Sequence, residues 1–333
     1  MSAGSESGLG RKLAALRDPA AYPHPVVSIE AIETHYAWVF LAGDYAYKLK
    51  KPVRVERMDH RRLEARLHSC RDEVRLNRRL APDVYLGVMP LACGADGSLR
   101  VGGEGAPVEW LVRMRRLPRE RALDRAVAAH AVTPAIAIGI GTLLGEFYGS
   151  AAPVPITGDA LRQRLLAQVE ADCLELRSAD LAIPRELLER VIEAQRRYLR
   201  EHGAQLERRA ADGRFVEAHG DLRPEHVFIG SPPCVIDCLE FDRELRLLDP
   251  AEEIEYLSLE LDLIDAGWVG EIVSARCHEM IGDAPPAALA AFYRGRRGMH
   301  RAVLVARHRL DPLYRDAGDW RAGAIRYLHR VAG

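Results

Sequence analysis

The alternation of apolar and polar positions predicts a β-rich first part of the chain. Residues 26–51 are rich in β-branched and aromatic side chains on both sides of a Gly-Asp turn signal at 43–44, as expected for a hairpin. Further strand-like runs follow at 84–91, 99–101 and 108–114. Between them, apolar residues recur at helical spacing, which predicts one long helix over 59–80 with Asp59 as its N-cap.

The pattern becomes helical after residue 117. Helical periodicity covers 120–150, 158–178, 184–211 and 250–333, and a short β island interrupts it at 227–236. We therefore predict an α+β protein of two lobes, a small β-rich N-lobe with one long helix and a larger, mostly helical C-lobe. The expected ranges are an N-terminal extension at 1–25, the N-lobe at 26–117 and the C-lobe at 118–333.

Composition and charge exclude several classes of protein. The 333 residues include 47 basic and 48 acidic ones, so the formal net charge of -1 argues against a nucleic-acid partner. The longest apolar run, at 135–145, is shorter than the roughly 18–20 residues that cross a membrane. The first residues show no secretory signal, and the six cysteines form no C-x-x-C pair. We expect a cytoplasmic protein with reduced cysteines and no membrane partner, and the sequence does not predict its oligomeric state.

The lysines are unusual because the chain uses arginine almost everywhere else. Only four of the 47 basic residues are lysines, and three of them are Lys48, Lys50 and Lys51. A compact ammonium fits a crowded phosphate site differently from a planar guanidinium. Lys48 and Lys50 share one strand face because side chains alternate along a strand. The cluster indicates a phosphate site, and a solvated basic turn is the alternative.

The residues around the β island indicate phosphoryl transfer. The segment 219–226 reads His-Gly-Asp-Leu-Arg-Pro-Glu-His, and Asp237 ends the island. Kinases place an Asn five residues after the Asp of an H-x-D loop, where this chain has His226. The reaction needs a carboxylate to accept the proton of the attacking hydroxyl, and acids to hold a divalent metal against the phosphates. A tight loop and a short hairpin can bring two such acids together.

This stretch resembles the aminoglycoside phosphotransferase family, whose signature is H-G-D followed by a metal-binding Asn and an Ile-Asp strand. The resemblance covers roughly residues 26–310 and implies a protein-kinase-like fold. The segments 40–53, 73–80 and 108–114 resemble the branch found as the N-terminal half of bacterial two-part proteins, in which a P-loop ATPase domain follows. No P-loop motif occurs in this sequence.

The resemblance implies an ATP-dependent phosphotransferase that acts on a hydroxyl of a small-molecule acceptor, with Mg²⁺ as the metal and Mn²⁺ as an alternative. It makes Asp221 the catalytic base and Asp237 the principal metal ligand. It also makes Lys48 the contact to the α and β phosphates, with Glu73 as its ion-pair partner and Lys50 as the second candidate.

Further site residues follow from the same resemblance. His219 is expected to brace the catalytic loop rather than carry a proton. Arg223 either neutralises the transferred phosphoryl group or lies on the surface. His226 takes the place of the metal-binding Asn. The hinge whose backbone meets the adenine edge consists of Met114, Arg115, Arg116 and Leu117.

Three departures from the family pattern leave alternatives open. Imidazole suits softer metals than Mg²⁺, so His226 is an unusual ligand. The expected nucleotide-covering turn at 33–37 has no glycine, and the Asp-Pro-x-x-Asp motif ends in Glu253. A nucleotide-binding regulatory protein of pseudokinase type and a protein kinase are the alternatives.

The nature of the acceptor is also open. Arg297 and Arg301 suit an anionic acceptor through bidentate contacts. Asp262 and Asp265 suit a cationic one, and the sequence does not decide between them.

Overall fold

The structure is a computed structural model that describes residues 3–55, 58–178 and 181–332. The chain forms two compact units. Unit 1 comprises Met1–Arg119 and Val235–Arg243, and unit 2 comprises Glu120–Cys234 and Glu244–Gly333. These units differ from the expected ranges: the first 25 residues and the segment that carries Asp237 belong to unit 1, whose first stretch ends at Arg119 instead of 117.

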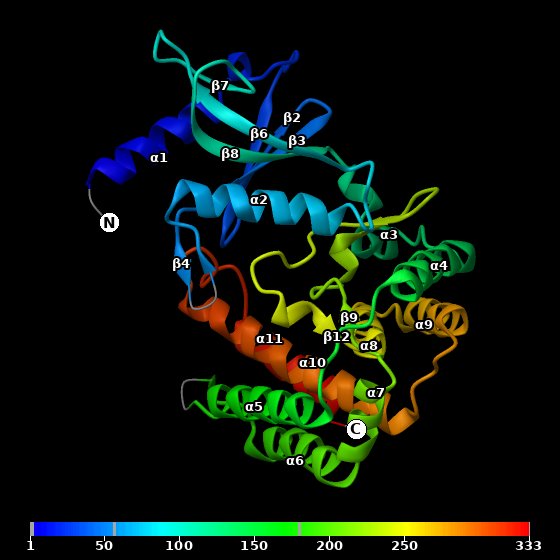
Figure 1. Ribbon diagram of the computed structural model, residues 1–333. Helices are drawn as coiled ribbons and strands as arrows, with labels where there is room; N and C mark the ends of the chain where they lie inside the picture. Colours follow the sequence, from blue (N-terminus) through cyan, green and yellow to red (C-terminus); the bar gives the residue numbers. More distant parts are fainter. Residues whose placement is uncertain (1–2, 56–57, 179–180, 333) are drawn as a thin grey trace. The chain divides into compact units, whose positions relative to one another are not determined.

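Unit 1 is built on an antiparallel sheet of six strands in the order β1-β2-β3-β8-β6-β7 (Figure 1). The strands are β1 (Ile29–Glu33), β2 (Ala37–Ala42), β3 (Tyr45–Lys50), β6 (Tyr85–Cys93), β7 (Leu99–Val101) and β8 (Ala106–Arg115). A small pair, β4 (Arg54–Val55) and β5 (Met58–Asp59), precedes the helix α2 (Leu63–Asn77), and α1 (Ala3–Leu16) opens the chain. The predicted hairpin is confirmed, because β2 and β3 pair across Gly43, whose φ of +59° suits glycine.

The two faces of this sheet have different chemistry. Tyr47 and Leu49 of β3 lie in an apolar core together with Leu16 of α1. Lys48 and Lys50 alternate with them, and both ammoniums contact a glutamate of α2. Helix α2 packs against β6 and β8 (Figure 1). The pleat of β3 therefore separates an apolar face from a charged face.

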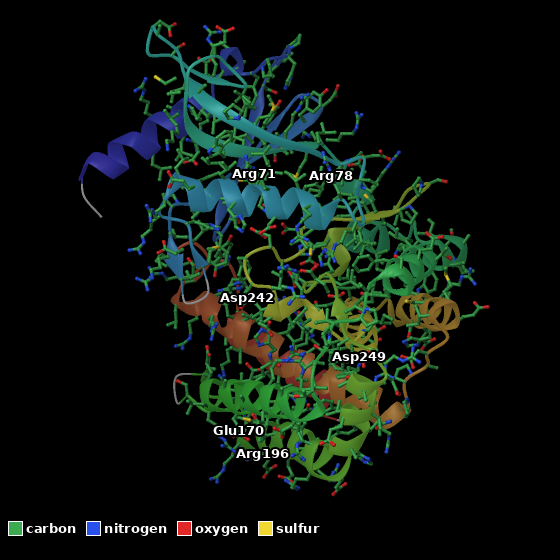
Figure 2. The ribbon with its side chains drawn as sticks, viewed as in Figure 1. Arg71, Arg78, Glu170, Arg196, Asp242 and Asp249 are labelled. Carbon is green, nitrogen blue, oxygen red and sulfur yellow. The ribbon has the colours of Figure 1, made fainter. Side chains whose placement is uncertain are left out.

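Helix α2 begins later than predicted. Asp59 lies in β5, where its carboxylate accepts from the backbone N–H and the guanidinium of Arg61, so the N-cap prediction was wrong. The residue before the helix is Arg62, which makes no side-chain cap. After the helix, Arg78 donates to the carbonyl oxygens of Tyr85 and Leu86 and so fixes the start of β6 (Figure 2).

The glycine-free turn between β1 and β2 is held by a threonine. The Thr34 hydroxyl oxygen accepts from the N–H of Ala37 at 3.1 Å, and the Thr34 N–H donates to the Ala37 carbonyl at 2.9 Å. This is a side-chain-closed turn of the kind that Ser, Thr and Asx residues favour. The turn needs no positive φ, so no glycine is required there.

Unit 2 is mostly helical, as predicted. Its helices are α3 (Leu123–Ala128), α4 (Pro134–Ser150), α5 (Gly158–Leu176), α6 (Arg185–Glu201), α7 (Gly203–Ala211), α8 (Pro250–Asp262), α9 (Gly267–Ile281), α10 (Ala287–Arg307) and α11 (Trp320–Val331). The short strands β9 (Val216–Glu217) and β12 (Leu247–Leu248) pair, and β10 (Val227–Phe228) and β11 (Cys234–Val235) form the predicted island.

The core of unit 2 forms where α5, α6, α10 and α11 pack together. On the outside, Glu170 of α5 and Arg196 of α6 form a two-pronged ion pair at 2.6–2.8 Å (Figure 2). Within the described residues, no helix combines the length and apolar character that a membrane span requires.

Candidate active site

Glu73 joins two lysines in the charged layer of unit 1. It is completely buried; one of its oxygens lies 2.9 Å from the Lys48 ammonium as an ion pair, and the other accepts a hydrogen bond from Lys50 at 2.6 Å. Burial by itself lowers the pKa of each lysine, but the neighbouring carboxylates outweigh it, so both pKa values lie above the ordinary value. Burial likewise raises the pKa of Glu73, and the two ammoniums reverse that shift. All three groups are therefore charged at neutral pH.

The two lysines differ in what else they can reach. Lys48 also donates to Asp237 at 2.7 Å, and its side chain is 16% exposed. Lys50 is only 2% exposed and donates to Glu240 in addition to Glu73. The Asp237 side chain is 47% exposed. Lys48 thus stands beside a solvent-accessible carboxylate, whereas Lys50 is enclosed between two acids.

Asp237 adopts a backbone conformation that the surrounding residues hold in place. Its φ of +63° lies in the left-handed region, which is unfavourable for a residue with a Cβ. The N–H of Asp237 donates to the Tyr85 hydroxyl at 3.1 Å, and the next N–H, of Cys238, donates to the Asn77 side chain at 2.9 Å. Strained residues of this kind persist where their neighbours over-determine them, often at functional sites.

The predicted hinge lies at the end of β8. Met114 is buried, the Arg115 N–H donates to the Val84 carbonyl at 2.9 Å, and the Arg116 N–H donates to the Asp44 carbonyl at 2.8 Å. These two amide hydrogens are already engaged inside unit 1. An adenine contact from this segment would therefore use its carbonyl oxygens or the N–H of Leu117.

In unit 2, Glu253 of α8 shapes the His-Gly-Asp loop. Its buried carboxylate accepts from the N–H of His219 at 2.9 Å, from the N–H of Gly220, and from the Tyr148 hydroxyl at 2.7 Å. Gly220 has a φ of +92°, which only glycine adopts without strain. The glutamate at the end of the Asp-Pro-x-x motif is thus a structural carboxylate.

Asp221 is held through one of its two oxygens. Oδ1 accepts from the Tyr256 hydroxyl at 3.0 Å and lies 3.0 Å from Nε of Arg223. Burial alone would raise the pKa of Asp221, but Arg223 above all, and then His226 and Arg301, bring it below the ordinary value. The side chain is 23% exposed, so this carboxylate is ionised and accessible.

The two histidines of the loop support Asp221. His219 is almost fully buried, and its Nδ1 accepts from the N–H of Asp221 at 3.3 Å. The Nδ1 of His226 lies 2.8 Å from the Asp221 carbonyl oxygen, and its Nε2 lies 3.4 Å from the Arg223 guanidinium. Both interactions of His226 hold its ring against residues of the same loop.

The donor groups decide how well the predicted metal ligands suit Mg²⁺. Asp237 offers a carboxylate, the ligand type that Mg²⁺ prefers, with half of its side chain exposed. His226 offers a nitrogen that faces a guanidinium, so its chemistry does not fit. Among the described residues, no three His, Cys, Asp or Glu side chains converge in a ready-made metal site. The Asp237 carboxylate suits Mg²⁺ better than the His226 nitrogen does, and the two ligand assignments stay predictions.

The candidate acceptor contacts are occupied by partners within unit 2. Arg297 lies 2.7 Å from Glu252, and its guanidinium stands 5.0 Å above the Tyr256 ring. Arg301 donates to Glu260 at 3.0 Å. The acidic candidate Asp262 pairs with Arg294 and Arg330. These pairs leave the charge of the acceptor open.

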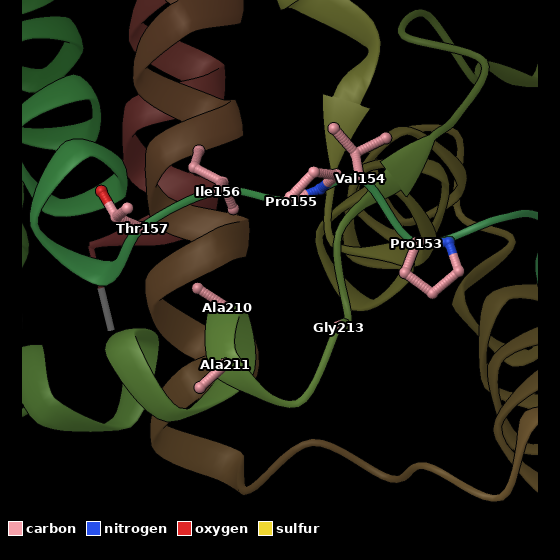
Figure 3. Close-up of a pocket in the computed structure, with 8 residues that line it drawn as sticks. All are labelled: Pro153, Val154, Pro155, Ile156, Thr157, Ala210, Ala211 and Gly213. Carbon is pink, nitrogen blue, oxygen red and sulfur yellow. The ribbon is translucent and has the colours of Figure 1, made fainter.

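Unit 2 also has an open hollow of about 410 Å³ (Figure 3). Its lining consists of Pro153, Val154, Pro155, Ile156, Thr157, Ala210, Ala211 and Gly213. None of these residues is titratable, and the Thr157 hydroxyl already caps α5 by accepting from the Ala160 N–H at 3.2 Å. The hollow lacks the groups that phosphoryl transfer needs.

Comparison with known proteins places this geometry in context. No family model matches the chain. The uncharacterised protein Rv2004c of Mycobacterium tuberculosis is 31% identical over 313 residues, as is the uncharacterised protein Mb2027c of Mycobacterium bovis, and each match covers 92% of this chain. The chain spans about 60% of the length of these relatives.

Two solved structures each match 99% of this chain. A choline/ethanolamine kinase family protein from Mesorhizobium loti has a TM-score of 0.54 at 18% identity and covers 99% of both chains. A thermostable mutant of the aminoglycoside phosphotransferase APH(4)-Ia, in a ternary complex with AMP-PNP and hygromycin B, has a TM-score of 0.53 at 10% identity and covers 99% of this chain and 98% of its own. The chain has an aminoglycoside-phosphotransferase-like kinase fold.

The kinase-like fold confirms the predicted fold class, and it confirms the resemblance to aminoglycoside phosphotransferases at the level of the fold. At this level of identity the likeness concerns the fold, and the site residues rest on their own geometry. Several residues that support the site were not predicted: Tyr85 and Asn77 around Asp237, and Tyr256 and Tyr148 around the His-Gly-Asp loop. Asn77 carried one signal, a polar residue within the apolar stripe of its helix.

Proposed function

We propose that the protein is an ATP-dependent phosphotransferase that transfers the γ-phosphate to a hydroxyl of a small molecule. The observation that carries the proposal is the Lys48 ammonium, which is shared between buried Glu73 and half-exposed Asp237 within one compact unit. This cluster sets a phosphate-binding cation directly beside an acid suited to a divalent metal. The kinase-like fold and the His-Gly-Asp loop support the same conclusion.

The residues of the chain have separate tasks in this reaction. Lys48 exchanges its contact with Asp237 for a phosphate oxygen, while Glu73 keeps it in place. Asp237 would hold Mg²⁺, and the bound ion would supply positive charge that offsets the charge of the phosphates. The acceptor oxygen bonds to the γ-phosphorus as the bond from that phosphorus to the bridging oxygen of ADP breaks. Asp221 takes the hydroxyl proton on Oδ2, because its Oδ1 is occupied by Tyr256 and Arg223.

The compared kinases support the choice of ligands. The APH(4)-Ia complex contains AMP-PNP and hygromycin B, and a spectinomycin phosphotransferase with a TM-score of 0.50 was solved with AMP. By analogy we propose a nucleotide at the cluster of Lys48 and Asp237, and a small-molecule acceptor at Asp221. We also propose a cytoplasmic location, where ATP is available.

The test is acceptor-dependent release of ADP, measured with a panel of hydroxylated metabolites and aminoglycosides in the presence of Mg²⁺. We expect Asp221→Asn to abolish turnover and leave nucleotide binding intact. We expect Asp237→Asn to weaken binding of the metal–nucleotide complex. Equal turnover by the wild type and Asp221→Asn would remove the assigned base and the proposal with it.

A second candidate function is nucleotide binding with little transfer, as in a regulatory pseudokinase. The observation that favours it is His226, which is engaged with the Asp221 carbonyl and Arg223 in the place of the second metal ligand. Thermal stabilisation by ATP with Mg²⁺ or Mn²⁺, without metal-dependent ADP production from any acceptor, would select this function.

A further inference from the structure

A second buried ion pair lies next to the cluster of Lys48 and Asp237. Lys50 donates to Glu73 at 2.6 Å and also to Glu240, three residues after Asp237. The Lys50 side chain is 2% exposed and that of Glu240 is 12% exposed. The residues of β3, α2 and the Asp237 segment therefore meet at one buried ammonium.

Because the Lys50–Glu240 ion pair is buried, we do not expect its main effect to be on the stability of the fold. Removing two charges from water costs several kcal/mol per ion, and the attraction between them often only offsets that cost. The better-attested use of such pairs is to select one arrangement of the chain. Lys48 and Lys50 each pair with one oxygen of the same Glu73 carboxylate. A compact ammonium can share a carboxylate in this way, whereas a planar guanidinium favours both oxygens at once. This explains why lysines occur here in a chain that otherwise uses arginine.

The segment at 235–243, which carries Asp237, is held by contacts on both sides of that residue. Before Asp237, the Val235 N–H donates to the Leu80 carbonyl at 3.3 Å. At Asp237 itself, the backbone is held by the Tyr85 hydroxyl in a left-handed conformation. After Asp237, Glu240 supplies a buried charged anchor to Lys50, and the ring of Phe241 lies 6.4 Å from that of Tyr36. The Lys50–Glu240 pair thus holds the segment on the far side of the strained residue.

We propose that Lys50 and Glu240 form a positioning pair that fixes Asp237 for the metal–nucleotide complex. This inference rests on the proposed function and deepens it. Lys48 contacts the phosphates, whereas Lys50 never touches the ligand and acts through the segment that carries Asp237. Without the pair, the segment loses its charged anchor, and the Asp237 carboxylate is spread over several orientations. The affinity for the divalent ion then falls, and the metal-independent contact of Lys48 with the nucleotide remains.

The experiment compares Lys50→Met, Glu240→Gln and the double variant with the wild type. The first measurement is the affinity for Mn²⁺ in the presence of saturating ADP, followed by electron paramagnetic resonance of the free ion. The second is the affinity for ADP without metal, measured by calorimetry. We expect a loss of about tenfold in Mn²⁺ affinity for each single variant, corresponding to about 1.4 kcal/mol, and less than a twofold change in metal-free ADP affinity. The two effects should not add in the double variant, because both changes break the same interaction.

Lys51→Met is the matched control. Lys51 also makes an ion pair, with Glu33 at 2.6 Å, and stands 4.7 Å above the Trp38 ring, and both of these partners lie outside the Asp237 segment. We expect its Mn²⁺ affinity to equal that of the wild type. If Lys50→Met does not fold, Glu240→Gln decides the question, since it keeps the size of the side chain and one acceptor oxygen.

The outcomes separate this inference from the proposed function. If the wild type binds neither ADP nor Mn²⁺ with ADP, the proposed function fails and the inference fails with it. If the wild type binds both, and folded Glu240→Gln binds Mn²⁺ as tightly as the wild type, only the positioning role is wrong. Equal losses in Lys50→Met and Lys51→Met would also overturn it, because the loss of either neighbouring lysine would then have the same effect without a contact to the Asp237 segment.

Discussion

Replacing Glu253 with glutamine tests how the catalytic loop is shaped. The carboxylate accepts from two loop amides, those of His219 and Gly220, and from the Tyr148 hydroxyl. Glutamine has nearly the same size but only one acceptor oxygen, and its NH₂ group is a donor. At least one of the three donors, the two loop N–H groups and the Tyr148 hydroxyl, would then face the NH₂ donor in the protein interior.

The magnitude follows from these three bonds. A hydrogen bond to a charged group contributes about 1.5–3 kcal/mol, against about 0.5–1.5 kcal/mol for a neutral one, and a buried donor without an acceptor costs about 1–3 kcal/mol. The bonds that remain in Glu253→Gln are weaker, and at least one donor is unsatisfied. We therefore expect a loss of about 3–4 kcal/mol in the free energy of unfolding. Tyr148→Phe removes one donor and leaves the loop amides paired, so about 1 kcal/mol is expected.

Urea unfolding followed by circular dichroism measures these changes in the free energy of unfolding. Acceptor-dependent ADP release by the folded variant shows whether the loop still supports turnover. Glu255→Gln on the same helix is the control. Burial raises the pKa of Glu255, and its partner Arg294 lies 3.7 Å away, so loss of this charge should cost less than about 1 kcal/mol. Equal unfolding energies for Glu253→Gln and Glu255→Gln would refute the structural role assigned to Glu253.

Three further predictions concern single groups. Burial, followed by Lys50 and Arg66, lowers the pKa of His60 to about 4. The free energy of unfolding should therefore fall by about 3 kcal/mol as the pH drops from about 6.5 to about 4. Denaturant titrations of His60→Gln should not show this fall. Tyr256→Phe removes the hydroxyl that donates to Asp221 Oδ1, so kcat should fall about tenfold with the KM for ATP unchanged. An unaltered kcat would contradict the role of Tyr256 in holding Asp221. Arg223→Gln removes the charge that most lowers the pKa of Asp221 while burial remains, so the acidic limb of the pH–rate profile should move to higher pH.

The local pattern of the sequence was sufficient for most of the fold. The strand period of two correctly placed Lys48 and Lys50 on one face of β3, because alternation along a strand is a property of the backbone alone. The start of α2 was wrong because a local pair, Asp59 with Arg61, competes for the side chain that was expected to cap the helix. Capping depends on such competition, which periodicity does not contain.

The site was predictable where it lies in a short motif and unpredictable where it depends on distant partners. The motif pointed to Asp221 and Asp237 through their spacing on the two sides of the β island, and their roles stay predictions. The residues that hold them come from far along the chain: Tyr256 is 35 positions from Asp221, and Tyr85 is 152 positions from Asp237. Pairing across such separations is set by packing, and a single sequence carries no signal for it. Glu253 was recognised only as a departure from a motif, and its bonds to the loop explain why an acid occurs there.

The central claim is that Asp221 directs a phosphoryl group from ATP to a hydroxyl. The most direct measurement is a reaction with ATP labelled in its γ-phosphate, Mg²⁺ and an acceptor found in the panel, with the labelled products separated and counted. The account predicts that the label appears in a phosphate ester of the acceptor with the wild type, and that ester formation is lost in Asp221→Asn. Label found only in inorganic phosphate, or equal ester formation by the two proteins, would contradict it.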